Sequence, residues 1–185
     1  MKIKNAILFV IAALSMVLMA TAQTPKQTEE NPLKNYADSQ LVEFLNSKDL
    51  KESSTAAKEL FSRGDRVIPE LLKLEGNNNC FYGLQALGKK GEPGSNYSDY
   101  VCEGNSKVSM EIAALYLISA IFEEDIEYAR PPFLHNENAT DGNNSKNIKT
   151  AWKATKRWYE TVKRDGIDYS RDRSQWPLRS VGMLF

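Results

Sequence analysis

Apolar residues recur every three or four positions in several separate stretches of the chain, and polar or glycine-containing stretches divide them. This spacing places the apolar side chains on one face of a helix, so each stretch predicts an amphipathic helix. The first predicted helix starts at Asp38 or Ser39, either of which is a suitable cap, and breaks near Asn46. Its apolar stripe consists of Leu41, Val42, Phe44 and Leu45.

Two predicted helices follow with almost no connecting residues between them. Ser53 or Ser54 is the expected cap of the first, and Gly64 ends it because glycine readily adopts a left-handed conformation. Asp65 is the expected cap of the second, which carries Pro69 in its first turn. With so short a connection, the two helices are expected to pack as an antiparallel hairpin.

The longest apolar stretch runs from residue 108 to about residue 128. Nearly every residue between Ile112 and Phe122 is apolar, which predicts a helix buried on most sides at the centre of the core. A further predicted helix runs to Arg164, with an inward face of Ala151, Trp152, Thr155, Trp158, Tyr159 and Val162. The tail after it is rich in apolar residues and is expected to pack back on the body.

The small and apolar positions of the predicted hairpin are Ala56, Ala57, Leu60, Gly64, Val67, Ile68, Pro69, Leu71, Leu72 and Leu74. This pattern resembles one HEAT-type helical repeat over residues 53–75, with a degenerate second copy starting at Cys80. The resemblance implies helical hairpins that serve as a scaffold for interaction rather than for catalysis. Because stacked repeats usually need three or more copies, we expect HEAT-like hairpins or an irregular α-bundle. The fold class is therefore all-α, in a single domain over residues 36–185.

The start of the chain has the features of an export signal. It has two early lysines, an apolar run over residues 6–19, and small residues at Ala20 and Ala22. These features predict a secretory signal peptide over residues 1–22, cleaved after Ala22, and a secreted or periplasmic protein. The apolar run is too short to span a bilayer, so no stable membrane anchor is expected after cleavage. Residues 23–35 are polar, with two prolines, and are expected to form a flexible lead-in.

Composition narrows the functional classes further. The signal holds two of the 24 basic residues and none of the 24 acidic ones, so the mature chain carries a formal charge of −2. Such a balance argues against broad nucleic-acid binding, which needs a strongly basic face. The chain has two cysteines, Cys80 and Cys102. In an exported protein they predict a disulfide, with free thiols or a metal site as the alternatives. No cofactor is expected.

Few groups suggest chemistry. His135 is the only histidine and sits in a polar stretch, which indicates an ordinary loop residue. Glu123 and Glu127 are four residues apart and share a helical face, where a carboxylate pair can divide acid and base roles. Acidic residues at a helix end more often form a solvated face.

Basic residues on the last predicted helix offer a candidate binding face. Lys153, Lys156 and Arg157 lie beside its aromatic residues, and the simpler interpretation is a solvated basic back on a core stripe. The leading hypothesis is a secreted or periplasmic helical module that binds a protein or peptide, such as an envelope inhibitor or an immunity-type protein. The alternative is a small extracellular or cell-wall hydrolase that uses Glu123 and Glu127.

Overall fold

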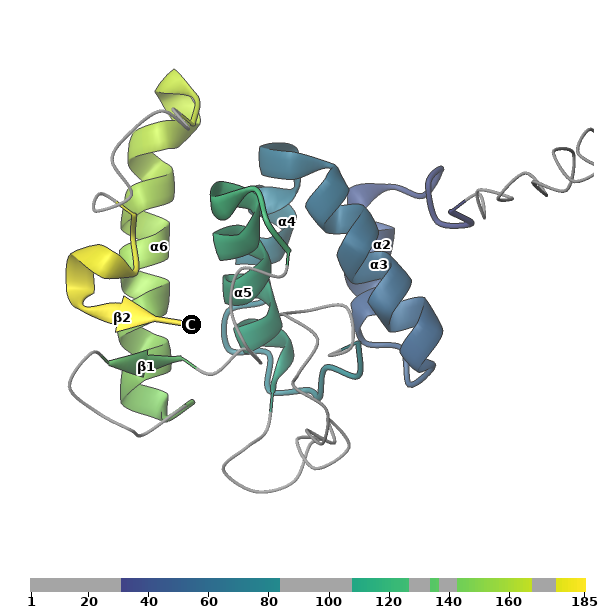
Figure 1. Ribbon diagram of the computed structural model, residues 1–185, viewed down its shortest axis with the longest axis horizontal. Helices are drawn as coiled ribbons and strands as arrows, with labels where there is room; N and C mark the ends of the chain where they lie inside the picture. The colour runs from purple at the N-terminus through teal and green to yellow at the C-terminus, as the bar shows by residue number, and fades with distance from the viewer. Residues whose placement is uncertain (1–30, 84–107, 127–133, 137–142, 168–175) are drawn as a thin grey trace, which may run out of the picture. The chain divides into compact units, whose positions relative to one another are not determined.

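The computed structural model describes residues 31–83, 108–126, 134–136, 143–167 and 176–185. These residues belong to one compact unit, Asn31–Phe185, and most of them are helical (Figure 1). The all-α prediction is therefore confirmed, with one two-stranded sheet as the addition. Within the described ranges, no helix is long and apolar enough to cross a membrane.

Helices α2 (Asp38–Leu45) and α3 (Leu50–Ser62) make the most extensive helix–helix contacts of the described chain. The predicted caps are wrong in both cases. The cap of α2 is Ala37, whose N–H donates to the Gln40 side chain at 2.9 Å. The cap of α3 is Asp49, whose Oδ1 accepts from the main-chain nitrogens of Lys51 and Glu52 at 2.8 and 3.2 Å. This acidic cap starts α3 several residues earlier than the serines predicted.

Ser53 has a different role from the predicted one. It is fully buried inside α3, and its hydroxyl donates to the carbonyl of Leu45 at 2.7 Å. The bond ties the C-terminal end of α2 to the start of α3. Helix capping and helix packing therefore use neighbouring polar residues that the sequence pattern does not distinguish.

A tight turn follows α3, as predicted. Gly64 has φ +69°, a conformation that favours glycine, and it opens the 3₁₀ turn η1 (Gly64–Val67). Helix α4 (Ile68–Leu72) starts directly afterwards, with Pro69 in its first turn. Asp65 lies inside η1, so the predicted cap is wrong. Helix α4 has only five residues and packs mainly against α5, whereas α3 packs mainly against α2. The prediction that the two helices joined by Gly64 pack on each other as a hairpin is therefore wrong for their main contacts.

Helix α5 (Met110–Glu123) is the centre of the core, and this prediction is confirmed. Every residue from Met110 to Ile121 is buried, and the helix contacts α3, α4 and α6. Figure 1 shows α5 between the α6 side and the α2–α4 side of the unit. So complete a burial explains why polar residues are rare along this helix.

Helix α6 (Ser145–Asp165) and the tail form the remaining part of the described unit. Strands β1 (His135–Asn136) and β2 (Met183–Leu184) pair antiparallel, and the short turn η6 (Arg179–Val181) precedes β2. Trp176, Leu178 and Met183 are each 1% exposed. The prediction that the tail packs back on the body is confirmed for residues 176–185.

The segment before α2 is anchored to α3. Leu33 is buried, and the Asn31 side chain donates to Glu59 Oε2 at 2.5 Å. The flexible lead-in predicted over residues 23–35 therefore does not extend to Asn31 and Leu33, because an apolar side chain and a buried carboxylate hold them. Residues 1–30, with the predicted signal peptide, lie outside the described residues.

Arg63 organises this anchor. Its guanidinium donates to Asp38 Oδ1 at 2.5 Å, to Glu59 Oε1 at 2.9 Å, and to the carbonyls of Lys34 and Tyr36, each at 2.8 Å. The Arg63 side chain is only 8% exposed. Burial lowers its pKa, but the bonds to the two carboxylates outweigh this and hold the pKa above its usual range.

Candidate functional site

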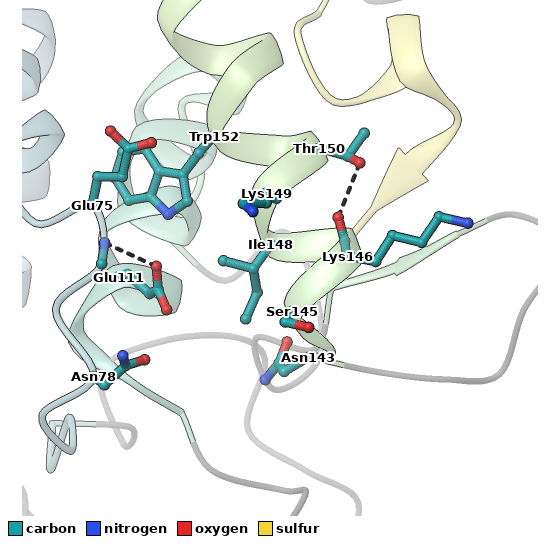
Figure 2. A pocket seen from close by; sticks show the side chains of 11 residues that line it. Glu75, Asn78, Glu111, Asn143, Ser145, Lys146, Ile148, Lys149, Thr150 and Trp152 are labelled. Atoms are coloured by element: carbon teal, nitrogen blue, oxygen red, sulfur yellow. Dashed lines mark hydrogen bonds between the residues drawn. The ribbon is translucent and has the colours of Figure 1, made fainter.

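A pocket of about 870 Å³ lies where the segment after α4, the start of α5 and the first turns of α6 meet (Figure 2). Glu75, Gly76 and Asn78 form one wall, Glu111 projects from α5, and residues of α6 from Ser145 to Trp152 form the other wall. This volume is in the range of small-molecule and peptide side-chain sites.

Main-chain bonds fix the wall after α4 to the start of α5. The main-chain N–H groups of Met110 and Glu111 donate to the carbonyls of Asn79 and Asn77, at 2.8 and 3.1 Å. The N–H of Phe81 donates to the carbonyl of Val108 at 2.9 Å. The first N–H groups of a helix have no partners inside the helix, so an adjacent strand-like segment is a natural partner for them. The pocket wall is thus part of the core scaffold.

Glu111 places a carboxylate in the pocket although the residue is only 6% exposed. Its Oε2 accepts a hydrogen bond from the N–H of Gly76 at 3.0 Å, and Figure 2 shows this bond. The residue lies in the first turn of α5, where the helix dipole favours negative charge. Glu111 therefore provides a fixed acceptor within the pocket.

Trp152 provides a donor beside that acceptor. The residue is 1% exposed, and its Nε1 is buried with no hydrogen-bond partner among the residues that the structure describes. Figure 2 shows the indole nitrogen on the side of the ring that faces Glu111. Buried indole N–H groups usually find an acceptor, and leaving one unpaired costs about 1–3 kcal/mol. A ligand acceptor would satisfy this group.

The predicted basic face lies on the exposed side of α6, and one of its members reaches the pocket rim. Lys156 Nζ lies 2.6 and 2.9 Å from the two carboxylate oxygens of Glu75, which lines the pocket. Lys153 and Arg157 are exposed. The prediction that these basic residues form a solvated face opposite the core-facing side of α6 is therefore confirmed. The predicted role in partner binding is not tested by these contacts.

The other predicted site residues that the structure describes are not part of the pocket lining. The Glu123 side chain is 5% exposed, and its Oε1 is 3.8 Å from Arg179 Nη2. Glu127 lies outside the described residues, so the structure does not describe the proposed carboxylate pair. His135 lies in β1. Among the described residues, no group of three or more histidine, cysteine or acidic residues is arranged to hold a metal ion.

Cys80 lies opposite Ser109 in an isolated antiparallel β-bridge. Cys102 lies outside the described residues, so the predicted disulfide stays a prediction.

The sequence alone does not identify Glu111 and Trp152 as site residues. Trp152 belongs to the predicted inward face of the last helix, and an indole there is indistinguishable from ordinary core. Glu111 carried the stronger signal, because it is a single carboxylate beside a long apolar run that predicts a buried helix. A buried charge in that position needs a partner or a function.

The pocket is thus a concave site with a fixed acceptor, a buried donor and apolar surface from Ile148 and the indole. Comparison with known proteins assigns no family to the chain. No protein-family model, no curated protein and no solved structure matches the chain.

Proposed function

We propose that the chain is an exported helical module that binds a segment of another protein in the pocket between α5 and α6. The observation that carries the proposal is a pocket of about 870 Å³ that holds both a buried carboxylate and a buried indole N–H with no described partner. Specific recognition sites combine apolar surface with a few fixed polar groups of this kind. An envelope inhibitor or an immunity-type protein is a role that suits such a module.

The binding proposal is tested by capture. The mature chain is immobilised and exposed to envelope extract, and a partner is expected to bind saturably. Ser145 is exposed at the pocket mouth, so Ser145→Trp fills it and is expected to reduce capture at least about tenfold, a loss of 1.4 kcal/mol. Lys58→Trp, at an exposed position on α3, is the matched control and is expected to bind normally. Equal capture by both variants would show that the partner does not bind in the pocket.

The location is tested by fractionation and mass spectrometry of the expressed chain. We expect the protein in the periplasmic or extracellular fraction, with Gln23 as its first residue. A cytoplasmic protein that keeps residues 1–22 would contradict export.

The disulfide between Cys80 and Cys102 is proposed for the same exported state. Closing a loop of this size stabilises a folded chain by about 3 kcal/mol in the chain-entropy model. Under denaturing conditions without reductant, we expect no alkylation of either cysteine, and after reduction we expect both to react. Alkylation before reduction would show free thiols.

A further inference from the structure

Two buried polar groups of opposite kind share the pocket. Glu111 offers an acceptor whose Oε2 is already held by Gly76, and Trp152 offers an N–H donor with no partner among the described residues. Both residues are more than nine-tenths buried. A ligand that satisfies both must present a donor and an acceptor to the same small region.

The charges around the pocket narrow the choice. A cationic group has donors only, so it would pair with Glu111 and leave the indole N–H of Trp152 unsatisfied. An anionic group would accept from the indole but would meet the carboxylate of Glu111 in a buried setting, where like charges repel strongly. The neighbouring charges weaken this result little. Glu75 is paired with Lys156, and the Lys146 side chain points away from the pocket centre in Figure 2. Lys149 also lines the pocket, but it is exposed, so solvent and salt screen its charge.

A neutral carboxamide meets both requirements. Its N–H donates to a carboxylate and its C=O accepts from an indole, and the two groups lie on different atoms of one planar unit. The apolar surface of Ile148 and Trp152 suits the alkyl carbons beside such a group. We propose that the pocket recognises a carboxamide of the partner, from an asparagine or glutamine side chain or from a main-chain peptide. This inference rests on the proposed function and adds the chemical group that the pocket recognises.

The Trp152 indole N–H gives a direct readout by ¹H–¹⁵N NMR. The chain has three tryptophans, and Trp152→Phe assigns the signal. The probes are capped tripeptides Ala-X-Ala, with X as glutamine, alanine, glutamate or lysine, and maltose as a hydroxyl-only probe. We expect a saturable downfield shift of this signal with the glutamine peptide. Preference over the alanine peptide assigns the side-chain source, and equal binding of all four peptides assigns the main-chain source.

Two variants separate hydrogen bonding from charge. Trp152→Phe removes the donor and is expected to weaken binding about tenfold, whereas Trp158→Phe is the matched control and is expected to bind normally. Glu111→Gln removes the charge and keeps one acceptor oxygen, whose two lone pairs can accept from both the Gly76 N–H and the ligand N–H. It is expected to keep binding within about threefold, because a neutral ligand does not need the charge.

Several outcomes would overturn the carboxamide assignment. These are no shift with any peptide, binding of the lysine peptide alone with loss in Glu111→Gln, or equal binding of maltose. If Ser145→Trp abolishes capture from extract but Trp152→Phe does not, the pocket binds a partner and the carboxamide assignment is wrong. If the peptides bind but no partner is captured from extract, the proposed function is the part that fails.

Discussion

Arg63 is the residue that joins the start of the described chain to α3. It contacts two carboxylates and two main-chain carbonyls, and its side chain is 8% exposed. Arg66 also contacts Asp38, at 2.9 Å, but its side chain is 62% exposed. Two arginines of the same turn therefore share one carboxylate in very different surroundings.

Replacing Arg63 with alanine is expected to destabilise the protein by about 3 kcal/mol, because it leaves Glu59 and Asp38 without their buried partner. The free energy of unfolding is measured in urea. Arg66→Ala is the matched control and is expected to cost less than about 1 kcal/mol, because exposed ion pairs contribute little. Similar losses in the two variants would contradict the role given to burial.

Asp38 makes the stability depend on pH. Burial raises its pKa, but hydrogen bonds from Arg66 and Arg63 outweigh burial and hold the pKa below its ordinary value. A lowered folded-state pKa gives stability that is full above the unfolded pKa of about 3.9 and is lost as pH falls through the folded value. The difference in unfolding free energy between wild type and Asp38→Asn is therefore expected to be constant near neutral pH. It should shrink below about pH 4, and a constant difference down to pH 2 would exclude this linkage.

At the scale of elements, the periodicity of apolar residues predicted the helices better than their starts. The burial of α5 and the inward face of α6 follow from long patterns of apolar residues, because only one orientation of each helix buries those side chains. The caps of α2 and α3 differ, because several polar residues near each start are equally suitable by type. Only the fold decides that Asp49 caps α3 and that Ser53 bonds Leu45 instead.

Asp49→Ala is expected to lower the free energy of unfolding by about 1 kcal/mol, because two N–H groups of the first turn of α3 lose their acceptor. Asp49→Ser keeps a capping oxygen and is expected to restore most of the loss. Thermal unfolding followed by circular dichroism measures both variants. A serine variant as unstable as the alanine variant would point to a role of charge rather than capping.

At the scale of the whole molecule, the sequence could predict the core but not the pocket. The pocket depends on Glu75, Glu111 and Trp152, which lie far apart in sequence. Main-chain bonds between residues 77–81 and 108–111 bring Glu75 and Glu111 together, and the packing of α6 against α5 adds Trp152. No local residue pattern predicts that these three side chains lie together. The carboxylate pair and the basic face were predicted from local spacing, and local spacing says little about which surfaces meet.

The same main-chain bonds hold residues 81 and 108 next to each other, since the N–H of Phe81 donates to the carbonyl of Val108 at 2.9 Å. Residues 89–105 are rich in glycine, serine and asparagine, a composition that predicts a loop. We therefore expect that this segment can be replaced by a short Gly/Ser linker. In a Cys80→Ser background, the free energy of unfolding is expected to stay within about 1 kcal/mol of the Cys80→Ser parent, because loop-closure entropy varies slowly with length. Loss of cooperative unfolding in urea would contradict this.

The burial of the tail has a consequence for the order of events in the cell. Trp176, Leu178 and Met183 belong to the core around α5 and α6, so this core is complete only after residues 176–185 have been synthesised. Until then, we expect the α5 surface that packs against Trp176 and Phe185 to stay accessible to chaperones. A chain that remains open during synthesis is also in the state that translocation of an unfolded polypeptide requires. Late closure would thus give the proposed export route time to act before folding competes with it.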